Sequence, residues 1–234
     1  MFRILIANSK GGSGKTTVTT TLAGYFARCG RVTTLVDGDP QGSSLAWCRQ
    51  RPAHLAPVHA LASGDPAHGL HAGWLLRIPA NTGVLLLDTP AGLRMHELER
   101  FARHADVLLV PVVPSAIDLR ATLAFLDGIR KLHEVRAGQL RVALVANRVR
   151  ERTRSARQLD AALDRLTEAA IVRVRDSQVY VAAAEAGRSL FDDDGSAARS
   201  HRDDWQALFD WIARRMAQPA NVTPLPTAGN RVAV

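Results

Sequence analysis

A glycine-rich loop between an apolar segment and a helical one constrains the fold of this chain more than any other feature. The apolar run covers residues 2–7, and the loop then reads Lys10-Gly11-Gly12-Ser13-Gly14-Lys15-Thr16-Thr17. Glycines let the main chain curl so that its N–H groups point inward at a phosphate. In such a loop Lys15 reaches the β- and γ-phosphates, and the Thr16 hydroxyl takes a place on Mg²⁺. The order of strand, loop and helix favours a phosphate-binding loop over a flexible linker.

Lys10 stands at the first position of the loop, where an ordinary phosphate loop needs no cation. A lysine there can reach a nucleotide that a facing protomer holds, much as an arginine finger acts in trans. The alternative is a solvated surface lysine.

Acidic residues follow two further apolar segments. Residues 32–36 end in Asp37-Gly38-Asp39-Pro40-Gln41, and residues 84–87 end in Asp88-Thr89-Pro90. In an open parallel sheet the carboxyl ends of strands converge on the ligand. We therefore expect Asp37 and Asp88 to support Mg²⁺ with Thr16, most simply through water, and Asp39 to orient an attacking water. Each aspartate taken alone could instead cap a helix or a turn.

These motifs resemble those of the ParA/MinD group of deviant-Walker ATPases, especially the small ParF-like plasmid partition ATPases. Later matches are Pro111-Val112-Val113-Pro114-Ser115, Gln178-Val179-Tyr180-Val181 and Gly187-Arg188-Ser189-Leu190-Phe191. The resemblance implies an ATP hydrolase with a sandwich dimer across which Lys10 reaches the partner's nucleotide. Lys10, Lys15 and Asp39 are then the catalytic candidates. The resemblance also implies non-specific DNA binding, and slow hydrolysis stimulated by a small centromere-binding partner of the ParB or ParG kind.

The chain departs from its ParF-like relatives near residue 177. Those relatives usually carry an arginine before Gln-Val-Tyr, where this chain has Ser177. Arg173 and Arg175 lie close by and could substitute for it. Asn147 follows an apolar strand where many relatives place an asparagine that recognises the base. Asn147 completes the set of candidate ATP contacts. The alternative is that it is an ordinary turn residue at the end of a strand.

The charge of the chain favours a polyanionic partner. The net charge is +8 and the isoelectric point is near 10.6. Such a field attracts nucleic acid, and phosphate contacts raise affinity without reading sequence. The alternative is that these arginines are merely solvated. The candidate DNA contacts are Arg148, Arg150, Arg152, Arg154, Arg157, Arg173 and Arg175.

Apolar strands alternate with helical patterns, which predicts an α/β fold with a mostly parallel sheet and helices on both faces. The expected strands are 3–8, 32–37, 84–88, 106–112, 141–146 and 170–174. The expected helices are 15–29, 41–50, 94–103, 116–134, 155–168, 178–186 and 202–216. Residues 1–216 are expected to form one domain and residues 217–234 a disordered tail. The stretch 51–83 carries no clear motif.

Three other interpretations are weaker. The last helix carries apolar residues on one face (Trp205, Leu208, Phe209, Ile212 and Met216), as would a membrane-binding helix of MinD-like ATPases. Its polar face begins acidic, however, so a helix docked on the sheet is the simpler explanation. A metabolic phosphotransferase or a metal-insertion ATPase would need an acceptor pocket or a Cys-x-x-Cys pair, and Cys29 and Cys48 have no such spacing. We therefore expect a cytoplasmic, nucleoid-associated protein without zinc or a membrane partner.

Overall fold

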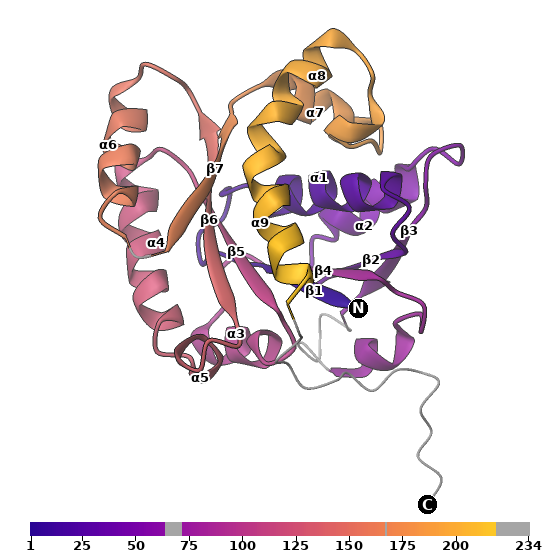
Figure 1. The fold of residues 1–234 in the computed structure, drawn as a ribbon, viewed down its shortest axis with the longest axis horizontal. Coiled ribbons are helices and arrows are strands. Elements are labelled where there is room, and N and C mark those ends of the chain that lie inside the picture. The colour runs from indigo at the N-terminus through magenta and orange to yellow at the C-terminus, as the bar shows by residue number, and fades with distance from the viewer. Residues whose placement is uncertain (64–71, 167, 219–234) are drawn as a thin grey trace, which may run out of the picture.

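The computed structural model describes residues 1–63, 72–166 and 168–218 (Figure 1). Within these residues seven strands form one parallel sheet in the order β3-β2-β4-β1-β5-β6-β7. The strands are β1 (Phe2–Ile6), β2 (Thr33–Asp37), β3 (Val58–Ala62), β4 (Val84–Asp88), β5 (Val107–Val112), β6 (Arg141–Val149) and β7 (Ala169–Arg175). This confirms the predicted α/β class.

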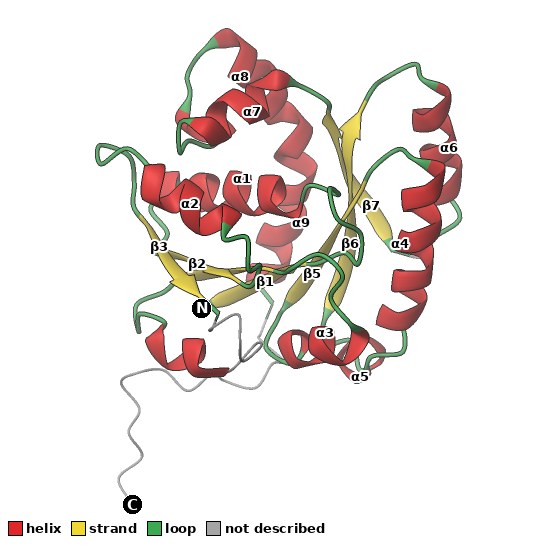
Figure 2. Cartoon of the chain, turned by 180° about the vertical axis from the view of Figure 1, so that it is seen from behind, coloured by secondary structure: helices red, strands yellow, loops and turns green. Residues whose placement is uncertain are grey.

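Helices cover both faces of the sheet, as predicted (Figure 2). One face carries α1 (Lys15–Arg28), α2 (Ser43–Gln50), α7 (Gln178–Glu185), α8 (Ser196–Arg202) and α9 (Gln206–Met216). The other face carries α3 (Met95–Ala102), α4 (Ala116–Ile129), α5 (His133–Arg136) and α6 (Arg154–Leu163). Because side chains alternate along a strand, Ile4 and Ile6 of β1 enter the first core and Leu5 enters the second. A strand buried on both faces has to be apolar throughout, which explains the continuous run at residues 2–7.

The predicted helix 116–134 is wrong, because the chain breaks it in two. Helix α4 ends at Ile129, and the main chain is extended at Leu132 (φ −59°, ψ 138°) before α5 begins. The Leu132 side chain is buried in the core, so the break allows one more apolar residue to leave water.

The predicted helix 202–216 also differs from the structure. Its first residues belong to α8 and to the short helix η3 (Asp203–Trp205), and α9 begins only at Gln206. The unassigned stretch 51–83 contains β3 and the short helix η1 (Ala72–Arg77), with residues 64–71 outside the described part. Apart from Ala217 and Gln218, the predicted tail also lies outside the described residues.

The apolar face of α9 packs against the sheet. Trp205, Leu208 and Ile212 are at most 1% exposed, and the Tyr25 ring stacks on Phe209 with ring centroids 3.5 Å apart. The Trp205 indole N–H donates a hydrogen bond to the Tyr180 hydroxyl at 3.0 Å. This agrees with the docked helix and not with a free membrane-binding face.

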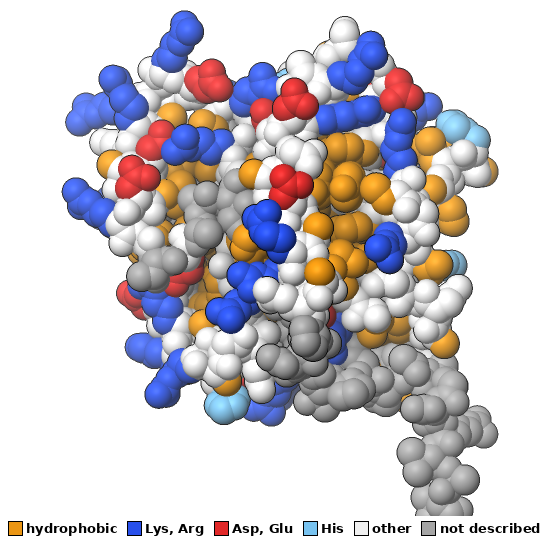
Figure 3. All heavy atoms as spheres, in the orientation of Figure 1, with side chains coloured by type: hydrophobic (Ala, Val, Ile, Leu, Met, Phe, Trp, Pro, Cys, Tyr) orange, Lys and Arg blue, Asp and Glu red, His pale blue; other side chains and the backbone are white. Residues whose placement is uncertain are grey.

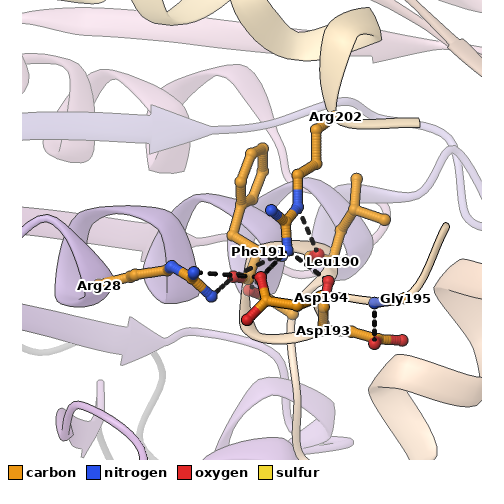
Figure 4. Close-up of polar contacts among 8 residues, drawn as sticks. Arg28, Leu190, Phe191, Asp193, Asp194, Gly195 and Arg202 are labelled. Atoms are coloured by element: carbon orange, nitrogen blue, oxygen red, sulfur yellow. Dashed lines mark hydrogen bonds and ion pairs between the residues drawn. The ribbon is translucent and has the colours of Figure 1, made fainter. Parts of the chain in front are cut away.

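An acidic turn connects α7 to α8, and two arginines hold it (Figure 4). The turn contains the short helix η2 (Leu190–Asp192). Arg28 of α1 and Arg202 of α8 both donate to the Phe191 carbonyl oxygen and pair with the Asp194 carboxylate. Arg202 also donates to the Leu190 and Asp193 carbonyl oxygens. The turn is thereby fixed to α1, the helix that follows the glycine-rich loop.

We expect Gly187→Ala to destabilise the protein more than Gly30→Ala. Both glycines have a positive φ, 63° at Gly187 and 74° at Gly30. A Cβ at Gly187 would lie 2.4 Å from the Gln50 carbonyl carbon at the end of α2, whereas one at Gly30 would meet nothing within 4 Å. The left-handed backbone alone costs about 1–2 kcal/mol for alanine. Because main-chain atoms must also move at Gly187, its loss should reach roughly 3 kcal/mol or more.

Urea unfolding followed by circular dichroism measures both losses. Gly30→Ala is the matched control for the backbone conformation. Equal losses in the two variants would contradict the predicted contact between Gly187 and α2.

Candidate functional site

The glycine-rich loop lies at the carboxyl end of the central strand β1, and α1 begins directly after it. Gly12 (φ 75°) and Gly14 (φ 88°) adopt backbone conformations that glycine favours. The Lys15 ammonium lies inside the loop and donates to the carbonyl oxygens of Asn8 at 3.3 Å and Lys10 at 3.2 Å. Burial lowers the pKa of Lys15, and the charges of Asp88 and Asp39 oppose that shift. The loop therefore places a cation beside a main chain curled by glycines, an arrangement suited to an anion.

Thr16 and Asp88 meet across the sheet edge and fit an Mg²⁺ ion. The Thr16 hydroxyl donates to Asp88 Oδ2 at 3.0 Å. Asp88 is 2% exposed, and its other oxygen is buried without a hydrogen-bond partner among the described residues. Burial, together with the neighbouring Asp37, raises the pKa of Asp88 to about 7. A cation would satisfy the orphaned oxygen and relieve this repulsion.

An Mg²⁺ ion at this place would need ligands besides carboxylates. Within the described ranges no cluster of three or more His, Cys, Asp or Glu side chains could hold a metal. Mg²⁺ commonly takes one or two protein oxygens and completes its shell with phosphates and water, so this arrangement suits it. Ser44 on α2 was not predicted from the sequence. Its buried hydroxyl makes no hydrogen bond of standard geometry within the described residues, yet it lies near enough to Asp88 to oppose the rise of that carboxyl's pKa.

Asp37 and Asp39 differ in what already holds them. The two oxygens of Asp37 accept the N–H groups of Asp39 and Leu45, each at 2.9 Å. Asp37 therefore organises the start of α2, which was the alternative left open, while its charge still reaches Asp88. One oxygen of Asp39 accepts the Gln41 N–H at 2.9 Å, and the carboxylate is near enough to Lys15 to act on its charge.

Asn8 and Asp118 are site residues that sequence reasoning missed. The Asn8 amide donates to the Pro111 carbonyl oxygen at 2.7 Å and to the Thr122 hydroxyl at 3.0 Å, and its oxygen accepts the Lys10 N–H. The Lys10 ammonium lies 3.5 Å from Asp118 in the first turn of α4, with 41% of its side chain exposed. A polar residue at the end of an apolar strand could have revealed Asn8. No local signal marks Asp118.

Asn147 supports the loop directly. Its amide nitrogen donates to the Ser13 carbonyl oxygen at 2.9 Å, and a Cβ at Gly14 would lie 1.9 Å from that nitrogen. Gly14 is thus required for this close approach as well as for its φ. The structure brings Asn147 to the loop, where it holds the main chain, and base recognition remains a proposal.

The predicted arginine cluster divides into two groups. Three of its members are paired: Arg150 with Asp176 at 2.7 Å, Arg173 with Asp160 at 2.9 Å and Arg175 with Asp204 at 2.9 Å. The others are exposed and have no ion pair in the described structure: Arg148, Arg152, Arg154 and Arg157. Arg148 lies near the end of β6, Arg152 lies in the loop that follows, and Arg154 and Arg157 lie on α6, on a flank where basic side chains gather (Figure 3). Ser177, in the place of the expected arginine, accepts the Val179 N–H and begins α7.

Comparison with known proteins agrees with this geometry. The CobQ/CobB/MinD/ParA nucleotide-binding domain profile matches residues 4–189. The chain belongs to the ParA/MinD family. It is 31% identical over 219 residues to "Maintenance of carboxysome distribution protein A" from Halothiobacillus neapolitanus, which covers 90% of this chain and 96% of that relative.

Solved structures of the ParA/MinD family share the fold. A plasmid partition protein of Borrelia burgdorferi bound to AMPPNP aligns with a TM-score of 0.70 and 15% identity, over 90% of this chain and 99% of its own. MinD of Pyrococcus horikoshii with Mg-ADP aligns with a TM-score of 0.68 and 19% identity, over 93% and 99%. Among the described residues of the present chain, no helix is long and apolar enough to span a bilayer.

We expect the Mg²⁺ dependence of nucleotide binding to vary with pH around the raised pKa of Asp88. Mg²⁺ favours the ionised carboxylate and must displace its proton, so protonation below about pH 7 competes with the metal. The apparent Mg²⁺ affinity should fall toward roughly tenfold per pH unit below that value and level off above it.

Titrations of Mg²⁺ with a fluorescent ATP analogue between about pH 6 and pH 8.5 would measure this. The Mg²⁺ affinity of the free analogue over the same range is the control for its own protonation. A dependence no steeper than that of the free analogue would refute the role of Asp88.

Proposed function

We propose that this chain is an ATP hydrolase that dimerises with ATP, binds DNA non-specifically and partitions a DNA cargo. The observation that carries the proposal is Lys10, whose main-chain carbonyl accepts from Lys15 while its own ammonium points to another partner. Its ammonium is partly exposed, and within the described residues its ion pair is with Asp118 at 3.5 Å. A partly exposed pair at this distance is weak, so exchanging Asp118 for a partner's phosphates costs little.

A site of this composition supports slow hydrolysis in a single protomer as part of the proposal. Bound Mg²⁺ would neutralise charge on the β- and γ-phosphates, with Thr16 and Asp88 as its protein-side supports. Asp39 would orient the attacking water. Lys10 would complete the charge stabilisation only from the facing protomer, so a monomer lacks one cation of the catalytic set. Stimulation by a small centromere-binding protein fits a site that is left incomplete in this way.

We expect Lys10→Ala to keep ATP binding but to lose ATP-dependent dimerisation and hydrolysis. Lys15→Ala should instead lose nucleotide binding, because its ammonium occupies the phosphate cradle. Light scattering with ATP and Mg²⁺ measures the dimer, and a fluorescent nucleotide measures binding. Equal dimer formation by Lys10→Ala and the wild type would refute the action of Lys10 across the dimer.

The unpaired arginines are the better candidates for DNA contact. Arg150, Arg173 and Arg175 already face carboxylates, which a DNA phosphate would have to displace. Arg148, Arg152, Arg154 and Arg157 carry no such competitor in the described structure. Arg148 (φ 53°) and Arg152 (φ 64°) also hold left-handed backbones, an uncommon conformation for arginine. Arg148 directly follows Asn147 near the end of β6, so this part of the chain connects the nucleotide site to the basic flank.

We expect Arg152→Glu with Arg154→Glu to weaken binding to duplexes of any sequence while ATP binding persists. Each DNA phosphate that the protein no longer neutralises should flatten the dependence of log affinity on log salt by about 0.9. Gel-shift titrations at several salt concentrations measure both effects. Arg150→Glu with Arg173→Glu changes the net charge equally and is the matched control, with a smaller expected effect. Equal effects of the two pairs would indicate general charge attraction and not a contact surface.

A second candidate cargo is a protein assembly. The relative from Halothiobacillus neapolitanus, named for maintaining carboxysome distribution, matches almost its full length. The same switch and the same DNA surface would serve either cargo. Deletion of the gene distinguishes them: loss of a replicon supports DNA partition, whereas normal DNA inheritance with a misplaced protein compartment supports the second cargo.

A further inference from the structure

Helix α2 brings a buried serine to the edge of the sheet that carries the candidate Mg²⁺ site. Ser44 lies in the first turn of α2, and its exposed fraction is 0%. The next residue, Leu45, donates its N–H to Asp37 Oδ2 at 2.9 Å. Asp37 lies directly opposite Asp88 in the pairing of β2 with β4. The start of α2 is therefore held beside the Asp88 carboxylate.

Two buried polar atoms lie in this region. The Ser44 hydroxyl and Asp88 Oδ1 are both buried, and neither makes a hydrogen bond of standard geometry within the described residues. The hydroxyl nevertheless reaches the carboxyl, because it opposes the rise in the pKa of Asp88. A serine hydroxyl can donate, whereas an ionised carboxylate oxygen only accepts. Ser44 is therefore a suitable donor for the Asp88 oxygen that Thr16 leaves free.

Donors on both oxygens would fix the plane of the Asp88 carboxylate. The Thr16 hydroxyl already donates to Oδ2 at 3.0 Å, and the same hydroxyl is the one expected on Mg²⁺. A carboxylate that is held by this hydroxyl alone is free to turn about its Cβ–Cγ bond when Thr16 adjusts to the ion. A second donor on Oδ1 removes that freedom. Partners that orient the groups around a metal in this way raise its affinity.

Contacts at the far end of α2 keep Ser44 in place. The Trp47 indole N–H donates to the Arg188 carbonyl oxygen at 2.9 Å. Arg51 follows the helix and forms a bidentate pair with Asp192, at 2.8 and 3.0 Å. Both of these side chains are at most 4% exposed. Because α2 is held at both ends, its serine belongs to a rigid element, and such elements hold the groups of a site precisely.

We propose that Ser44 is a positioning residue of the Mg²⁺ site, whose hydroxyl fixes the orientation of the Asp88 carboxylate. It acts through Asp88 and does not touch the nucleotide. This inference rests on the proposed function, because it requires Mg²⁺ and ATP to bind at this edge of the sheet. In the protein without metal the hydroxyl makes no full hydrogen bond, so its removal costs little there. Its contribution therefore belongs to the metal-bound state.

Titration of the full chain with Mg²⁺ in the presence of a fluorescent ATP analogue tests the proposal. Ser44→Ala should weaken the apparent Mg²⁺ affinity at least about tenfold, the scale of losing a partner that orients a metal-binding group. Binding of the analogue in EDTA, without metal, should stay at the wild-type level. Ser43→Ala makes the same change at the neighbouring exposed serine and should alter neither quantity.

Urea unfolding without nucleotide or metal separates positioning from a purely structural role. Ser44→Ala should unfold at the wild-type midpoint. A lower midpoint, together with equal losses of analogue affinity with and without Mg²⁺, would show a structural role and overturn the proposal. Unchanged Mg²⁺ affinity in Ser44→Ala would overturn it as well, while leaving the proposed function intact. A wild-type protein whose analogue binding does not depend on Mg²⁺ would overturn both, so the two failures are distinguishable.

Discussion

The nucleotide site depends on the register of three central strands. Asp88 of β4 lies opposite Ile6 of β1 on one side and opposite Asp37 of β2 on the other. Because the strands are parallel, all three end at the same edge, and the loop after each one faces the same point. A slip of one residue would turn Asp88 into the other face of the sheet and separate it from Thr16. The buried apolar faces of β1 and β4 prevent that slip.

The register also brings charged groups together in a buried place, which is electrostatically unfavourable. Two carboxylates of neighbouring strands are buried beside a lysine whose own pKa is lowered. All three groups are largely withdrawn from water, so a bound Mg²⁺ nucleotide complex would relieve a free-energy cost that the folded protein already bears. The strand pairing would in this way contribute to the affinity for nucleotide.

Helix α4 connects this edge to the rest of the molecule. Thr122 receives the Asn8 amide, and Asp118 faces Lys10. The start of the loop is thereby fixed to a helix on the face opposite to α1. Asn147 fixes its other end, through the Ser13 carbonyl oxygen, to the end of β6, where Arg148 follows directly and the loop with Arg152 begins. The glycine-rich loop is therefore in direct contact with α4 and with the end of β6 that leads to the basic flank.

The sequence by itself determined the fold class, the loop and the order of acidic strand ends. These depend on local patterns. A continuous apolar run indicates a strand buried on two faces, and closely spaced glycines indicate a tight turn, and both can be read from the residue types alone. The break before Leu132, the pairing of Arg150, Arg173 and Arg175, and the roles of Asn8 and Asp118 were decided only by the tertiary structure. Each depends on a contact between residues distant in the chain, such as Arg175 with Asp204 or Lys10 with Asp118. Long-range packing brings such partners together, and a single sequence does not show which distant residues will meet.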